Sequence, residues 1–311
     1  MKLIVRGILI LSIFVTVGIH VAEADEIEES SNRSDKSYEV MMKQDILSLM
    51  MAYPEYISAV EKSQDGKIFV ITVSGKKILY DDKQKKNFNQ KMDNSDLQDI
   101  LEDIYPLESI YKLLEVNSDP GRFRNYDLLN EVYGKSEGQV SKNLVGVPAP
   151  YNNYEFNKSN GAAESLRAAM VELKLLAKNN QSVASLISPI NGTFNYRLIA
   201  GTGKLSPHAY GIAIDVRSNP SDYWKWATRE AGEKRMLSYP KELVEVFEKY
   251  NFVWGGKWGH FDILHFEYRP EVVIKAKYFG GVIDEEQWFG SVIRDDNVNG
   301  YIEIINSVLG Q

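Results

Sequence analysis

The stretch that decides the fold is SPHAYGIAID, residues 206–215, which contains His208 and Asp215. Residues seven apart on an unbroken strand face opposite sides. His208 and Asp215 can therefore approach one another only if the chain bends between them. Gly211 is the residue that permits such a bend or bulge. We expect an irregular segment here that brings both polar side chains to one side.

A second stretch, FDILHFE at residues 261–267, adds Asp262 and His265. These two lie three apart, so they also need an irregular backbone, and a glycine-rich loop precedes them. The two histidines, His208 and His265, together with one aspartate suit a zinc ion, because three protein ligands leave the fourth coordination position open for water. Considered singly, each residue also fits a structural role, as a turn histidine, a strand-end cap or a buried hydrogen-bonded histidine.

Composition narrows the classes of function. The chain has 311 residues, 44% apolar and 25% charged, which is typical of a folded protein of about two domains. It has 36 Lys and Arg against 43 Asp and Glu, a net charge of -7, which disfavours nucleic acid as a partner. The absence of cysteine excludes disulfides, thiol catalysis and thiolate zinc sites, so any metal site must use His, Asp and Glu.

Three motifs together resemble a known family. They are S-x-H-x-x-G-x-A-x-D at 206–215, W-G-G-x-W at 254–258 and D-x-x-H-F-E at 262–267. Their order and spacing are similar to those of the zinc D-alanyl-D-alanine carboxypeptidase and L-alanyl-D-glutamate peptidase family. This family of cell-wall peptidases includes the vancomycin-resistance carboxypeptidases and several phage endolysins. The resemblance implies an α+β fold in which a small antiparallel sheet carries a zinc site with flanking helices.

The resemblance also implies roles for individual residues. One zinc ion would be bound by His208, Asp215 and His265. Asp262, three residues before the last ligand, would be the general base. Many family members have Glu at this place, whereas the endolysin-like branch has Asp. Glu267 is the alternative base, because strand alternation places it on the face of His265; its structural alternative is an ion pair or support for a ligand.

Further residues near the motifs are candidates for substrate binding. The family places an arginine before the first ligand, on the substrate carbonyl or the developing oxyanion, and Arg197 is the match. Ser206 is expected either to position substrate or to hold its turn. His260 is expected to be an exposed loop histidine and not a ligand. Trp224 and Trp226 suggest sugar stacking, but a core or lid segment is the interpretation that the sequence favours.

The chain organisation is predicted from its segments. A basic start, an apolar run over residues 7–19 and small residues before position 25 are typical of a secretory signal peptide. We expect location outside the bacterial cytoplasm, secreted, periplasmic or in the cell envelope, with membrane contact only if the signal stays uncleaved. The predicted parts are a signal peptide (1–24), a polar lead-in (25–38), a smaller N-terminal α+β domain (39–150), the zinc peptidase domain (151–272) and a C-terminal extension (273–311).

Periodicity and turn residues predict the elements within these parts. Helices are expected over 41–51, 96–104, 126–133, 162–178 and 241–250. Strands are expected over 57–60, 67–73 and 77–80, which form a meander, and over 252–254 and 263–268. The glycine-rich region 192–216 is expected to be strand-like.

The sequence predicts an exported zinc metallopeptidase that hydrolyses peptide bonds of peptidoglycan stem peptides. Zinc would activate water and a carboxylate would accept the proton. Either D-Ala-D-Ala carboxypeptidase or L-Ala-D-Glu endopeptidase activity is consistent with the motifs. The alternative from another class is a non-catalytic cell-wall binding module on a peptidase-like scaffold. The N-terminal domain could serve in wall attachment or as a structural cap, and the oligomeric state is not predicted.

Overall fold

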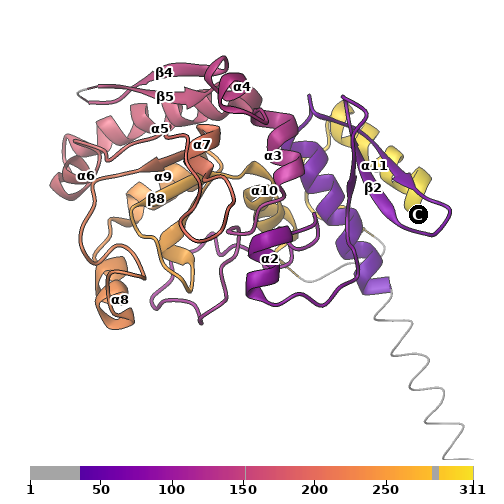
Figure 1. Cartoon of the computed structure of the whole chain (residues 1–311), viewed down its shortest axis with the longest axis horizontal. Coiled ribbons are helices and arrows are strands. Elements are labelled where there is room, and N and C mark those ends of the chain that lie inside the picture. The colour runs from indigo at the N-terminus through magenta and orange to yellow at the C-terminus, as the bar shows by residue number, and fades with distance from the viewer. Residues whose placement is uncertain (1–35, 151, 282–286, 311) are drawn as a thin grey trace, which may run out of the picture.

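The computed structural model describes residues 36–150, 152–281 and 287–310 (Figure 1). The predicted signal peptide and most of the lead-in lie outside the described residues. The described chain has the mixed α+β fold that the sequence predicts, and it contains three small antiparallel sheets. Among the described helices, none has the length and apolar character that a membrane span requires.

The N-terminal elements are a helix and a meander. Residues 36–52 are helical, so the predicted lead-in ends too late, at 38, and the predicted helix starts too late, at 41. The strands β1 (Ile57–Lys62), β2 (Ile68–Thr72) and β3 (Lys77–Leu79) pair in the order β1-β2-β3. The predicted meander is therefore confirmed.

The helix predicted over 96–104 is wrong. The helix in this region is α2 (Phe88–Asn94), and turns follow it. The carboxylates of Asp96 and Asp99 each accept the backbone N–H of the other, at 2.9 and 3.0 Å. Both carboxylates also bind the Lys86 ammonium, at 2.8 and 2.6 Å. Short acidic side chains that take up backbone N–H groups in this way compete with helix formation.

The middle of the chain is largely helical. Three helices match their predicted ranges to within one residue: α3 (Tyr126–Tyr133), α5 (Ala162–Ala177) and α9 (Lys241–Lys249). The predicted domain boundary near residue 150 falls at the turn of a hairpin that packs on α5. The remaining elements here are α4 (Glu137–Ser141), β4 (Leu144–Pro148), β5 (Asn153–Asn157), η1 (Ser159–Gly161), α6 (Gln181–Leu186) and α8 (Arg229–Leu237).

A third sheet carries the site predicted from the motifs. Its strands are β6 (Ala213–Asp215), β8 (His265–Tyr268) and β7 (Phe252–Trp254), with β8 in the centre. The antiparallel register sets Asp215 opposite His265. Most of the region 192–216 is not a strand, in contrast to the prediction, because its polar positions form turns and the short helix α7 (Pro207–Tyr210).

Gly211 makes the bend between α7 and β6. Its φ is 68°, in the left-handed region that glycine adopts without strain. A Cβ at this position would lie 2.8 Å from Leu144 Cδ2 and 3.2 Å from the backbone nitrogen of Asn157. Both the conformation and the close approach therefore require glycine, and the predicted bend is confirmed.

Replacing Gly211 with alanine is expected to lower the free energy of unfolding by about 2–4 kcal/mol, from left-handed strain plus overpacking. Gly75→Ala is the matched control, because Gly75 has a φ of 85° and nothing within 4 Å of the added Cβ. We expect only about 1–2 kcal/mol there, from conformation alone. Denaturant unfolding measures both, and equal losses would contradict a packing role for Gly211.

The C-terminal helices pack against the N-terminal elements. Helix α10 (Pro270–Phe279) follows β8 directly, and α11 (Asp296–Leu309) packs on β1 (Figure 1). The Tyr53 hydroxyl donates to Glu271 over 2.7 Å, and Lys275 pairs with Asp45 at 2.5 Å. The two ends of the described chain are thus joined by buried polar contacts as well as by apolar packing.

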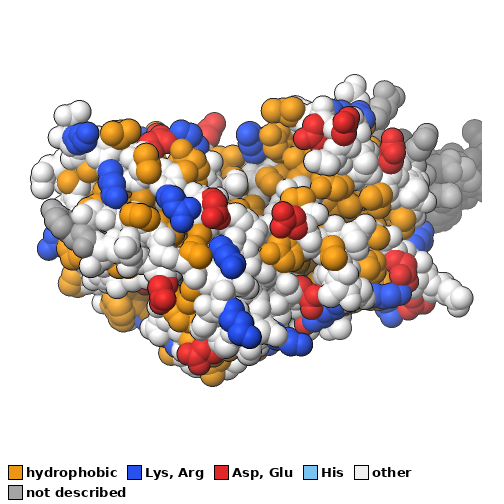
Figure 2. Space-filling view, turned by 90° about the horizontal axis from the view of Figure 1, so that it is seen from above, with side chains coloured by type: hydrophobic (Ala, Val, Ile, Leu, Met, Phe, Trp, Pro, Cys, Tyr) orange, Lys and Arg blue, Asp and Glu red, His pale blue; other side chains and the backbone are white. Residues whose placement is uncertain are grey.

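The outer surface carries both signs of charge. On the face shown in Figure 2, Lys and Arg side chains are interspersed with Asp and Glu among hydrophobic residues. A basic patch of the kind that nucleic-acid binders use is not present among the described residues of that face. This distribution agrees with the net charge of -7.

Candidate metal centre

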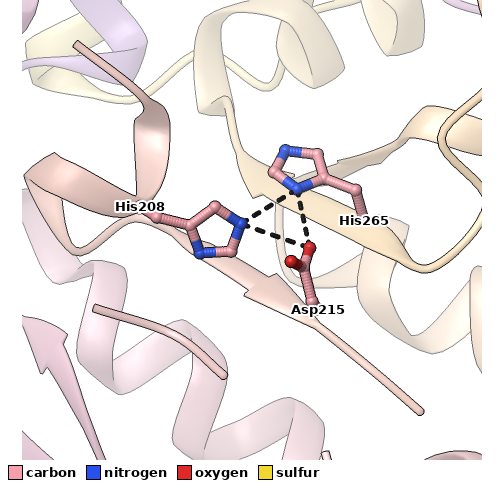
Figure 3. Close-up of side chains that lie close together, drawn as sticks. All are labelled: His208, Asp215 and His265. Atoms are coloured by element: carbon pink, nitrogen blue, oxygen red, sulfur yellow. Dashed lines mark hydrogen bonds and ion pairs between the residues drawn. The ribbon is translucent and has the colours of Figure 1, made fainter. Parts of the chain in front are cut away.

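Three predicted ligands converge at one end of the third sheet, β6-β8-β7. His208 comes from α7, Asp215 from the end of β6 and His265 from the start of β8 (Figure 3). Nε2 of His208 lies 3.2 Å from Nδ1 of His265 and 3.2 Å from Oδ1 of Asp215. Nδ1 of His265 lies 2.9 Å from the same oxygen. This donor set, two imidazoles and a carboxylate around one point, fits a zinc ion with an open fourth position.

Contacts behind the cluster orient both imidazole rings. Nδ1 of His208 lies 2.5 Å from the backbone carbonyl oxygen of Thr193. Nε2 of His265 lies 3.6 Å from the Glu267 carboxylate. Each ring therefore turns one nitrogen to a protein acceptor and the other to the shared point. Such partners fix the tautomer and the orientation of metal-binding histidines.

The charges of the three side chains are coupled. Burial opposes ionisation of Asp215, but His208 and His265 hold its pKa well below the usual value. Burial alone would lower the pKa of His265, but the carboxylates of Asp215 and Glu267 raise it to about 10. A metal bound here would therefore displace a proton from His265, because a ligating imidazole must be neutral.

Glu267 lies in a buried ion pair, which is the structural alternative to its role as a base. One carboxylate oxygen accepts from Nε of Arg124 at 2.8 Å, and the other accepts from the Arg124 Nη2 group. Arg269 adds a second cation at 3.6 Å. Although burial opposes ionisation, these cations and His265 hold the pKa of Glu267 well below its usual value. Glu267 contacts the side of His265 that faces away from the shared point.

Asp262 lies in the turn that enters β8. Its N–H donates to the carbonyl of Gly255 at 2.9 Å, and its own carbonyl accepts from the His265 N–H at 3.1 Å. Desolvation raises the pKa of this half-buried residue to about 6; the charge of Asp215 adds to the shift and that of His265 opposes it. The turn therefore supplies the irregularity predicted between Asp262 and His265, and it keeps the carboxyl group within the field of the cluster.

The W-G-G-x-W motif forms the backbone of this turn. A Cβ on Gly255 would collide with the carbonyl oxygen of Asp262, and one on Gly256 would collide with the Trp254 indole. The Trp254 indole N–H donates to the carbonyl of Ile263 at 2.7 Å. The motif residues thus hold the Asp262 turn in place by close packing.

Two predicted substrate residues lie on the approach to α7. Ser206 is buried and caps α7, where its hydroxyl oxygen accepts from the N–H of His208 at 3.3 Å. This bond holds the turn before His208, and the expected role of Ser206 in positioning substrate stays a prediction. Arg197 is exposed, and its carbonyl accepts from the N–H of Ser206 at 3.0 Å. Its proposed contact with substrate stays a prediction.

The sequence did not single out the partners that the N-terminal half contributes. The carboxylate of Asp119 binds Nδ1 of His260 at 2.7 Å and its backbone N–H at 2.8 Å. His260 is therefore a half-buried, paired residue and not an exposed one, although it is no part of the cluster. Arg124 lies 143 positions before Glu267, and no local pattern connects residues at that separation.

The scaffold and its cluster define a candidate single-metal centre on an α+β fold. Comparison with known proteins adds that residues 200–268 match a family model described as D-alanyl-D-alanine carboxypeptidase. The resemblance inferred from the motifs is thereby confirmed over this segment, which contains the three convergent residues and Asp262. The match supports a peptidase of the carboxypeptidase type. No curated protein and no solved structure gives a significant match.

Proposed function

We propose that this chain is an exported zinc metallopeptidase that hydrolyses peptide bonds in the stem peptides of bacterial peptidoglycan. One observation carries the proposal: His208, Asp215 and His265 converge within hydrogen-bond distance of one another, and the half-buried Asp262 precedes the last of them by one turn. The predicted signal peptide supports location outside the cytoplasm, where this substrate lies.

The residues of the site divide the chemistry between them. When bound at the cluster, zinc supplies a Lewis acid and lowers the pKa of a water molecule. Asp262 accepts the proton of the attacking water and passes it to the leaving amine. In the chain without a metal, burial raises its pKa to about 6, toward the range in which a carboxyl group both accepts and releases a proton. Arg197 is the cation proposed to bind the carbonyl oxygen as negative charge develops there.

Two bonds are candidates for cleavage. The description of the matching family model favours removal of a terminal D-Ala. An aspartate at position 262, in place of glutamate, favours the L-Ala-D-Glu bond, because it is typical of the endolysin-like branch. The non-catalytic binding module is less well supported, since loss of Asp262 and Arg197 would be expected of such a module and both residues are present.

The test is digestion of purified muropeptides by the zinc-loaded protein, with products identified by mass spectrometry. We expect cleavage that a chelator abolishes and added zinc restores. Loss of alanine from the peptide end would identify a carboxypeptidase, and new fragments that end at L-Ala would identify an endopeptidase. His208→Ala is the inactive control. Intact substrate after incubation with folded, zinc-loaded protein would favour the binding module.

A further inference from the structure

Two aromatic side chains border the site without a part in the mechanism above. Trp226 is 67% exposed, and Tyr223 is half-buried beside it. Their ring centroids lie 5.1 Å apart with an interplanar angle of 72°, an edge-to-face pair. A single exposed aromatic residue on a protein surface needs no explanation. The Tyr223–Trp226 pair differs from a single exposed aromatic residue because Tyr223 lies beside Asp262.

Tyr223 pairs directly with the proposed base. Tyr223 and Asp262 form an isolated antiparallel bridge. The flanking hydrogen bonds run from the Ile263 N–H to Asp222 at 2.7 Å and from the Trp224 N–H to Phe261 at 3.0 Å. Because the two bonds flank Tyr223 and Asp262 and do not join them, these two residues form a non-hydrogen-bonded pair. The side chains of such a pair project from the same face, with Cβ atoms about 4.5–5.5 Å apart. The Tyr223 side chain therefore starts next to that of Asp262.

The charges around Tyr223 agree with this placement. Burial and the charge of Asp262 raise the pKa of the Tyr223 phenol, whereas the cations of Arg122 and Arg197 act in the opposite direction. Tyr223 thus lies within the field of both Asp262 and the arginine predicted to contact substrate. The aromatic pair is at the edge of the reaction site.

Hydrogen bonds and ring contacts fix the segment 219–226, which contains Tyr223 and Trp226. The buried Asp222 carboxylate binds Nε of Arg235 at 2.7 Å and accepts the N–H of Asn219 at 2.6 Å. The Tyr223 carbonyl accepts the N–H of Trp226 at 2.8 Å. Trp224 packs edge-on against His260, with centroids 4.6 Å apart. The Trp226 indole is therefore exposed on a fixed support, which makes the aromatic wall of Tyr223 and Trp226 preformed.

We propose that this aromatic wall binds a pyranose ring of the peptidoglycan glycan strand, an inference that rests on the proposed function. Within a muropeptide, only the sugar rings offer a broad C–H face that matches an indole. The alanine side chains are single methyl groups, and the acidic side chains favour Arg or Lys. An amphipathic ring pair with one exposed apolar face and a phenol hydroxyl suits a sugar, which has both C–H faces and hydroxyl groups.

The distance between the sugar and the scissile bond differs for the two candidate bonds. An extended residue spans about 3.5 Å, so a sugar four residues from a D-Ala-D-Ala bond lies about 14 Å away. The sugar is only one residue from an L-Ala-D-Glu bond. Tyr223 pairs with Asp262, and Trp226 extends the wall outward by a further 5.1 Å between ring centroids, so the wall accommodates a sugar for either bond.

The experiment compares a disaccharide-linked stem peptide with the same peptide without sugar. Trp226→Ala is expected to raise KM for the sugar-bearing substrate about tenfold and to leave kinetics on the bare peptide unchanged. Tyr111→Ala is the matched control, because Tyr111 is an exposed aromatic residue, 71% accessible, outside the site. Equal effects of Trp226→Ala on the two substrates, or no effect on either, would overturn the proposal.

Calorimetric titration of the zinc-free protein separates this proposal from the proposed function. Wild-type protein that cleaves neither substrate would argue against the peptidase, but the sugar site is still judged by binding. We expect the sugar-bearing peptide to bind more tightly than the bare peptide, and Trp226→Ala to remove that difference. Equal affinity of the wild-type protein for both peptides would refute the aromatic wall as a sugar site.

Discussion

Replacing Asp262 with asparagine is expected to lower kcat/KM for stem-peptide hydrolysis about 10²–10⁴-fold, the usual contribution of a general base. Asparagine keeps the size of the side chain but cannot accept the proton of the attacking water. The turn that holds position 262 is built from backbone hydrogen bonds to Gly255 and His265, so the fold is expected to persist. Steady-state kinetics measure the loss, and metal analysis is expected to show one zinc per chain in the variant.

Glu267→Gln separates the two carboxylates that the sequence left as candidate bases. Glu267 lies between Arg124 and Arg269, behind His265, so its replacement is expected to weaken zinc binding and stability and not the proton transfer itself. With zinc at saturation, Glu267→Gln is expected to retain far more activity than Asp262→Asn. The reverse order of activities would assign the base to Glu267 instead.

Replacing Arg124 with methionine is expected to lower the free energy of unfolding by about 3–5 kcal/mol, because it leaves the buried Glu267 carboxylate without its main partner. It is also expected to weaken zinc affinity about 10–100-fold, since Glu267 orients His265. Denaturant unfolding with and without zinc measures the first effect. Competition with a chelator of known affinity measures the second.

Two further variants test whether the loss of stability in Arg124→Met comes from the uncompensated charge of the buried Glu267. Lys249→Met removes a surface ion pair with Glu172 and is expected to cost less than about 1 kcal/mol. The double variant Arg124→Met with Glu267→Gln removes the uncompensated charge, so most of the stability is expected to return while zinc affinity stays low. Unchanged zinc affinity in both Arg124→Met and the double variant would show that the ion pair has no influence on His265.

Local patterns predict much of this fold. The apolar periodicity of α5 and α9 and the turn residues of the β1–β3 meander give these elements nearly their observed ranges. The bend at Gly211 follows from the seven-residue spacing once His208 and Asp215 are taken to share a metal, and the structure has it. In these places the local preference and the tertiary environment agree.

The remaining features depend on contacts between distant parts of the chain. Lys86 draws Asp96 and Asp99 together, and this pairing replaces a helix that the local pattern favours. The ligand cluster was identified through its motifs, whereas Arg124 and Asp119 belong to no motif. Arg124 binds Glu267 and Asp119 binds His260, and only the folded chain shows these two contacts.

Arg269, which directly follows β8, bears on which fragments of the chain can fold by themselves. Arg269 is buried and donates to the carbonyls of Gly121 and Phe123, at 2.7 and 2.9 Å, next to the Arg124–Glu267 pair. The matched segment, residues 200–268, ends one residue before Arg269 and contains only Glu267 of these groups, so a fragment limited to it would leave the Glu267 carboxylate without both of its arginine partners. The segment that the family model matches is thus shorter than the part of the chain that we expect to fold together, because that part includes the N-terminal residues that contact Arg269 and Glu267.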